Sequence, residues 1–148
     1  MLALILIAVT TAGCGGGKSS KASTTTTIPE ALWQGQARAY VAAHGDDLKG
    51  ISDAAQNLAN AAKGNNTTLS QIAVTQFLTK VGEAEGNLPA NAFGQDLHKV
   101  FVAYVTALGN IRNGIANNDQ KLYKQGSDEL SAAVASFGAI TNRIKASP

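Results

Sequence analysis

From Pro29 to the end of the chain, apolar residues recur every three or four positions, which is the period of an α-helix. Nowhere do apolar and polar residues alternate convincingly, as they do along a half-buried strand. Aromatic residues make up only 5% of the 148 residues, so a core must be built mainly from Ala, Leu, Ile and Val. The pattern therefore predicts a single all-α domain over residues 29–148.

Start and stop signals divide this region into four amphipathic helices. Pro29 suits the first turn of a helix, and Gly64 follows a lysine as glycines typically do just after a helix end. A second helix is predicted to begin at Thr68, which has capping-box spacing to a glutamine three residues later. A third helix is predicted to begin at Pro89, and the polar triplet at 117–119 is expected to cap a fourth.

The apolar stripe of each helix predicts which side chains form the core. Four such helices, joined by connections of about four to six residues, pack most economically as an up-down-up-down four-helix bundle. The stripes consist of Trp33, Ala37, Tyr40, Val41, His44, Leu48, Ile51, Ala55, Leu58, Ala59 and Ala62; Leu69, Ile72, Ala73, Gln76, Phe77, Lys80, Val81 and Ala84; Phe93, Leu97, Val100, Phe101, Tyr104, Val105, Leu108, Ile111 and Ile115; and Tyr123, Ser127, Leu130, Val134, Phe137, Thr141 and Ile144.

Gly45 leaves two interpretations of the first helix open. The glycine, followed by Asp46 and Asp47, could end one helix and cap the next. The apolar stripe keeps its phase across Gly45, however, and this favours one continuous helix.

Eight further glycines lie inside the predicted helices, each costing up to about 1 kcal/mol relative to alanine. We expect close helix packing to compensate for this cost. Gly35, Ala39 and Ala43 repeat every four residues and predict such a contact, and a similar row surrounds Ala107. The alternative is that these small residues leave space for a ligand between helices.

The chain opens on an unbroken apolar run at residues 1–9, followed by Thr11-Ala12-Gly13-Cys14. The run is too short to cross a bilayer as a helix, which takes about 20 apolar residues, and its character is that of a signal peptide. Small residues directly before a cysteine resemble the lipobox of bacterial lipoproteins. The resemblance implies that residues 1–13 are cleaved off and that Cys14 carries lipid such as palmitate, which anchors the protein on the extracytoplasmic face of the cell membrane. The alternatives are an ordinary secretory signal, or a buried N-terminal segment with Cys14 in the core.

Residues 14–28 have the composition of a flexible tether. They are rich in Gly, Ser and Thr, carry Lys18 and Lys21, and show no apolar periodicity. A coil of this length would hold the domain roughly 20 Å from its anchor on average.

Few residues suit a catalytic or metal site. His44 lies one turn after Tyr40 in the first stripe, where an imidazole could act as an acid, a base or a ligand, or simply be a hydrogen-bonded boundary residue. His98 is expected to be half-exposed, and its height along its helix differs from that of His44 by roughly 7 Å, so the two do not predict a shared metal or haem site. We predict no catalytic residue, no metal and no cofactor.

Trp33, the only tryptophan, is expected to close the open end of the bundle against the third or fourth helix, or else to contact a membrane or partner.

Charge argues against nucleic acid as a partner. The net charge of +2 comes from Lys18 and Lys21 in the tether, because residues 30–145 contain ten Lys and Arg and ten Asp and Glu. No basic cluster interleaved with aromatic residues is present in the sequence.

The sequence favours a non-enzymatic, lipid-anchored helical module that binds an envelope protein or a small ligand. A second hypothesis is a small-molecule carrier or sensor with a cavity between helices, lined by Tyr40, His44, Phe101 and Tyr104. A phage-type surface-exclusion lipoprotein is a variant of the first hypothesis, and an enzyme that uses His44 is a third.

Overall fold

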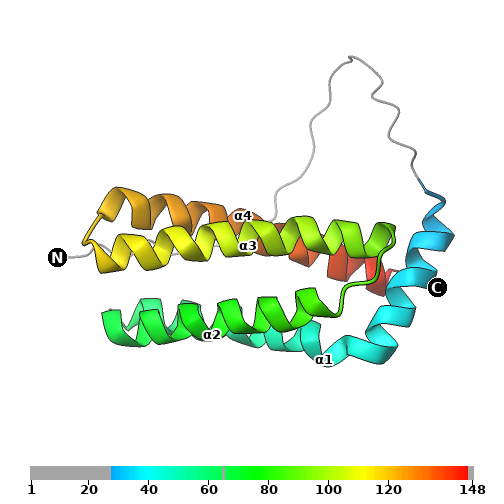
Figure 1. Ribbon diagram of the computed structural model, residues 1–148, viewed down its shortest axis with the longest axis horizontal. Coiled ribbons are helices and arrows are strands. Elements are labelled where there is room, and N and C mark those ends of the chain that lie inside the picture. The colour runs from blue at the N-terminus through cyan, green and yellow to red at the C-terminus, as the bar shows by residue number, and fades with distance from the viewer. Residues whose placement is uncertain (1–27, 65, 147–148) are drawn as a thin grey trace, which may run out of the picture.

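The computed structural model describes residues 28–64 and 66–146, and in these residues it forms a four-helix bundle without strands. The helices are α1 (Glu30–Lys63), α2 (Thr67–Gly86), α3 (Ala92–Ala116) and α4 (Gln120–Lys145). Successive helices run in opposite directions along the bundle (Figure 1). The predicted fold class is thereby confirmed, whereas the predicted signal peptide, Cys14 and the tether up to residue 27 lie outside the described residues.

The first helix is kinked, so the prediction of a continuous helix is wrong. His44 has φ −136° and ψ 26°, outside the helical region, and Gly45 follows it. The part of α1 before the kink lies across one end of the bundle, near the start of α3 and the end of α4, while the part after it runs beside α2 (Figure 1). We refer to residues 30–43 as the arm.

Asparagine and aspartate side chains cap the starts of α2, α3 and α4, whereas α1 follows Pro29 without a side-chain cap. The side-chain oxygen of Asn66 accepts a hydrogen bond from the backbone N–H of Leu69 at 2.9 Å, so α2 begins before the predicted Thr68. Likewise Asn91 caps α3, which begins three residues after the predicted Pro89. The predicted cap of α4 is confirmed at Asp119.

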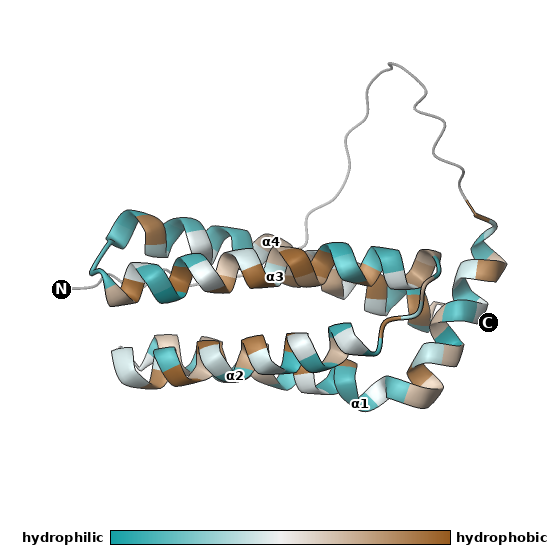
Figure 2. Ribbon diagram, in the orientation of Figure 1, coloured by the Kyte–Doolittle hydropathy of each residue, from teal (hydrophilic) through white to brown (hydrophobic). Residues whose placement is uncertain are grey.

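The core contains most of the predicted stripes of α1 and α3 but only half of that of α2, where Ala73, Phe77, Val81 and Ala84 are buried. Leu69 and Ile72 are about half exposed, while Ser70 and Val74 are buried beside the correctly predicted Phe77. Figure 2 shows the result as brown and teal residues interleaved along each helix. The remaining buried apolar side chains of the core are Trp33, Ala37, Tyr40, Leu48, Ile51, Ala54, Leu58, Phe93, Leu97, Val100, Phe101, Tyr104, Ala107, Leu108, Ile111, Ala133 and Phe137.

The other predicted core residues that are exposed are Ala59 in α1, Gln76 and Lys80 in α2, Val105 in α3 and Val134 in α4. In α4 the buried positions are Gly126, Ala133 and Phe137. A strict heptad seam placed Val134 inside, but the small Ala133 lies there instead because α4 packs very close to α3.

Close packing between α3 and α4 depends on two glycines. A Cβ added to Gly126 would lie 2.7 Å from the Ile111 nitrogen and 2.8 Å from the Ala107 oxygen, and one added to Gly114 would lie 2.5 Å from the Tyr123 nitrogen. The prediction that close helix packing compensates for the cost of glycine is confirmed at these two positions. The close contact predicted around Ala107 is confirmed as well, because Ala107 is fully buried and its carbonyl oxygen is one of the atoms that a Cβ on Gly126 would meet.

The same expectation is wrong for Gly82, Gly109 and Gly138, where an added Cβ would meet nothing within 4 Å, and for the small-residue row in the arm. A Cβ added to Gly35 would meet nothing within 4 Å, and Ala39 and Ala43 are exposed. No helix among the described residues packs on this row.

The substitution Gly126→Ala tests the α3–α4 contact. The added methyl group would meet backbone atoms, so α3 and α4 must separate, and we expect a loss of about 1–3 kcal/mol in the free energy of unfolding measured with urea. Gly138→Ala is the matched control in the same helix, because its methyl group would meet nothing within 4 Å. The control should be neutral or stabilise by up to about 1 kcal/mol, and equal stability of the two variants would contradict the packing described.

Candidate functional site

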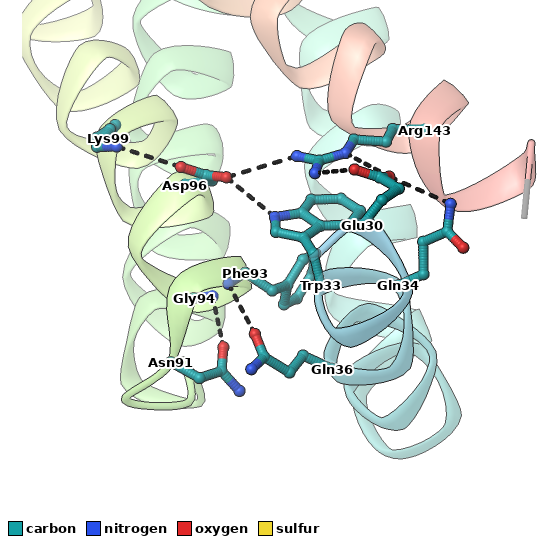
Figure 3. Close-up of polar contacts among 10 residues, drawn as sticks. All are labelled: Glu30, Trp33, Gln34, Gln36, Asn91, Phe93, Gly94, Asp96, Lys99 and Arg143. Carbon is teal, nitrogen blue, oxygen red and sulfur yellow. Dashed lines mark hydrogen bonds and ion pairs between the residues drawn. The ribbon is translucent and has the colours of Figure 1, made fainter. Parts of the chain in front are cut away.

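The arm joins the bundle through a buried tryptophan. Trp33 is only 1% exposed, its ring meets that of Phe93 edge-on at 5.3 Å, and its Nε1 donates a hydrogen bond to Asp96 Oδ2 at 3.0 Å. These contacts bring the first turn of α1 against the first turns of α3 (Figure 3). Trp33 therefore closes the end of the bundle, in the place that the sequence predicted.

Arg143, in the last turn of α4, covers the outer face of Trp33. Its Cζ lies 3.7 Å from the centre of the indole ring, its Nε donates to Glu30 Oε1 at 2.8 Å, and its Nη1 lies 3.8 Å from Asp96 Oδ2. A guanidinium stacked on an aromatic face while it bonds a carboxylate combines a cation–π contact with an ion pair. We call this group of four residues, Glu30, Trp33, Asp96 and Arg143, the clasp (Figure 3).

The charged groups of the clasp meet between helices, with the Arg143 guanidinium facing the carboxylates of both Glu30 and Asp96. The Arg143 guanidinium holds the pKa of the Glu30 carboxyl below its usual range, chiefly through the hydrogen bond between them, and the same bond raises the pKa of Arg143. Glu30 is therefore ionised at neutral pH.

The sequence singled out Trp33 but did not group it with the other three residues of the clasp, because Glu30 and Arg143 lie 113 positions apart. One signal was available: in an up-down-up-down bundle the start of the third helix and the end of the fourth lie at the same end. Asp96 and Arg143 occupy those two positions.

Two of the predicted ligand-binding residues lie together next to the kink. The ring of Tyr40 lies 5.2 Å from that of His44 and 5.4 Å from that of Phe93, and its hydroxyl donates to the Ala84 carbonyl oxygen at 3.5 Å. Tyr40 is 4% exposed, whereas the side chain of His44 is 38% exposed. The pair therefore presents an imidazole edge to solvent above a buried phenol.

His44 also faces a carboxylate. Its Nδ1 lies 3.6 Å from Asp47 Oδ2, which accepts a hydrogen bond from Asn87 Nδ2 at 2.9 Å. These contacts connect the kink of α1 to the end of α2.

The other two predicted residues lie elsewhere. Phe101 is fully buried, and Tyr104 is 1% exposed and packed between the rings of Phe77 at 5.0 Å and Phe137 at 6.1 Å. Both form part of the packed interior, so the four residues that we expected to line one cavity do not meet around a common space. Burial raises the pKa of Tyr104 as well.

A shallow groove of about 560 Å³ runs along the outer side of the arm. One wall is the exposed row of small residues that includes Gly35 and Ala39, and the other is the α2–α3 connection around Pro89. It suits an uncharged, mainly apolar ligand or surface. The residues that line it are Ala31, Leu32, Gly35, Gln36, Ala39, Tyr40, Ala43, His44, Asn87, Pro89 and Asn91.

The second histidine belongs to a different surface. His98 Nδ1 lies 2.9 Å from Glu85 Oε1, and both side chains are well exposed. Among the residues that the structure describes, no three His, Cys, Asp or Glu side chains are arranged to hold a metal ion. None of the helices in this part of the chain is both long and apolar enough to cross a membrane.

Tyr40 gives the arm a characteristic pH dependence. Burial, with the Asp47 carboxylate nearby, raises the pKa of Tyr40 to about 12, whereas an unfolded tyrosine titrates near 10. Between these values the unfolded chain has released the proton that the folded chain keeps, so the free energy of unfolding falls as pH rises.

We therefore expect Tyr40→Phe to become less sensitive to alkali. Urea unfolding of the unmodified chain between pH of about 9 and 11 should show a fall that includes about 1 kcal/mol from Tyr40. Tyr40→Phe should lose that part of the fall and keep the part due to Tyr104. At neutral pH the variant should lose less than about 1 kcal/mol, because the hydrogen bond from the hydroxyl to the Ala84 carbonyl oxygen is long, at 3.5 Å. An unchanged alkaline slope in Tyr40→Phe would contradict the burial of its hydroxyl.

Comparison with known proteins adds no family to this geometry. No protein-family model matches the chain, and neither a curated protein nor a solved structure shows a match to it. The arm, the clasp and the groove are therefore interpreted from their own chemistry.

Proposed function

We propose that this protein is a lipid-anchored helical module on the extracytoplasmic face of a bacterial cell membrane, with a binding rather than a catalytic role. The observation that carries the proposal is the order of features along the chain. A lipobox-like cysteine at 14 is followed by a stretch with the composition of a tether, and the first helix that the structure describes starts at Glu30. This order is typical of a domain that a flexible linker connects to a membrane anchor.

The polar contacts of the bundle support a binding role. The carboxylates that face neighbouring helices, such as Asp96 and Glu129, accept hydrogen bonds from Trp33 and Asn110 and so join helices together. His44, the imidazole in the groove, is paired with Asp47 beside the kink. These groups are engaged in structure, while the groove offers an uncharged surface to a partner.

The anchor is tested by the intact mass and location of the full chain in a bacterium that processes lipoproteins. The unsubstituted chain should lose residues 1–13, gain the mass of acyl groups and fractionate with membranes. Cys14→Ser should lose the added mass and leave the membrane fraction, whereas Ser19→Ala, a change within the tether, should retain both. An unmodified Cys14 in the mature chain would contradict the proposal.

A small-molecule carrier or sensor is the second candidate, and the groove is the observation that favours it. Its volume of about 560 Å³ lies within the range of roughly 300–1,000 Å³ typical of ligand pockets. The groove, with Tyr40 and His44, takes the place of the enclosed cavity that the sequence suggested.

Native mass spectrometry of protein extracted from its own host tests this candidate. We expect a retained small ligand that Ala39→Trp displaces, because the indole would fill the groove. Ala42→Trp is the control, since Ala42 is exposed on the arm but does not line the groove. A ligand retained equally by both variants, or by neither the variants nor the unsubstituted protein, would exclude a carrier that uses this groove.

A further inference from the structure

We propose that the arm is a hinged latch: residues 30–43 swing away from the bundle as a unit about His44 and Gly45, and the clasp formed by Arg143 controls how often they do so. The proposal concerns the folded domain itself and does not depend on acylation of Cys14.

The hinge is the break in helical geometry at His44. Because the residue after it is Gly45, the backbone there has more accessible conformations than it would with any other residue at this position. A rotation at this point leaves the second half of α1 paired with α2. It also leaves the contact of α3 with α4 unchanged, since the glycines that make it lie in those two helices.

The contacts that hold the arm lie together at one end of the bundle. Besides the clasp, Gln36 Oε1 accepts a hydrogen bond from the backbone N–H of Phe93 at 3.3 Å, and the hydroxyl of Tyr40 reaches the Ala84 carbonyl oxygen. They join the arm to the end of α2, the start of α3 and the last turn of α4. Because each partner is at a helix end, the arm can leave without the separation of any two other helices.

Arg143 is the central group of the clasp because it bridges three elements. It faces one carboxylate of the arm, Glu30, and one of α3, Asp96, while it lies on the Trp33 ring. Lys99 also contacts Asp96, from the exposed side. The ion pairs are partly exposed and so contribute modestly, but they act together with the stacking on a buried indole.

Opening would uncover an aromatic surface. Phe93 is fully buried in the closed state, between the rings of Trp33 and Tyr40. With the arm displaced, Phe93 faces solvent at the start of α3, and the inner face of the arm presents its own two aromatic rings. The latch thus hides an apolar surface in the closed state and presents it in the open one.

Trp33 provides a reporter of this motion without labelling, since the chain contains one tryptophan. We would follow acrylamide quenching of its fluorescence, and hydrogen–deuterium exchange by mass spectrometry, in the full chain at urea concentrations below the global unfolding transition. The arm amides and Trp33 should become accessible while the amides of α2 and α3 remain protected. Release of the arm only together with the whole bundle would overturn the proposal.

The variant Arg143→Gln tests the clasp. It removes the charge and the stacked cation, and we expect the arm amides to exchange about five- to thirtyfold faster while those of α2 and α3 change much less. Lys145→Gln is the matched control, because Lys145 is the other cation in the last turn of α4 and has no part in the clasp. It should change arm exchange less than about twofold. Equal effects of the two variants on the arm would exclude Arg143 as the controlling group.

The hinge is tested separately by Gly45→Ala, which keeps the proposal falsifiable if Arg143→Gln fails to fold. An alanine Cβ at this position would meet only Val41 Cγ1 at 3.7 Å, so the closed state accepts it. Because alanine restricts the open conformations, arm exchange should slow about two- to fivefold relative to exchange in α3. Gly138→Ala should leave that ratio unchanged. An unchanged ratio in Gly45→Ala would place the pivot elsewhere.

Discussion

The contact between the backbones of α3 and α4 is the constraint on which the rest of the bundle depends. At Gly114 and Gly126 the helices are so close that a methyl group would collide with backbone atoms of the neighbour. Two helices that touch in this way leave little room for large side chains between them. The large side chains of α3 are buried in the core that the four helices share, as Phe101 and Leu108 are.

Six of the eight aromatic residues form two layers. One layer, Phe77, Tyr104 and Phe137, comes from α2, α3 and α4 and lies in the body of the bundle. The other contains Trp33 and Phe93, together with Tyr40, and depends on the arm for two of its three rings. Burial of a large aromatic side chain contributes roughly 2–3 kcal/mol, so the second layer supplies most of the free energy that keeps the arm in place. The contact between the arm and the bundle is mainly apolar, and the ion pairs of the clasp fix the orientation of the arm within it.

This division also explains which parts of the structure could be predicted. The helical period is a local property, and it was sufficient for four helices, their order and Asp119 as a cap. It could not reveal the kink, because a bend at His44 does not change the phase of the apolar stripe on either side. Nor could it fix the packing of the small residues, since Gly35 and Gly126 occupy similar patterns but only Gly126 meets another helix. Glu30 and Arg143 meet only because two helix ends coincide in space, and a pairing of that kind is invisible to any local pattern.

The arm is the first described element of the chain, so a force applied to the residues that precede it reaches the arm before the rest of the bundle. Ile28 packs against the core and Glu30 begins α1, so the covalent path from the preceding residues into the bundle passes through the arm before it reaches any other element. A displacement applied from that side acts first on the clasp and the layer of Trp33 and Phe93, and only afterwards, through the kink, on α2 and α3. Because the arm contacts the ends of the other helices, a pull on the chain before Ile28 can release the arm first. The close contact between α3 and α4 at Gly114 and Gly126 then stays intact.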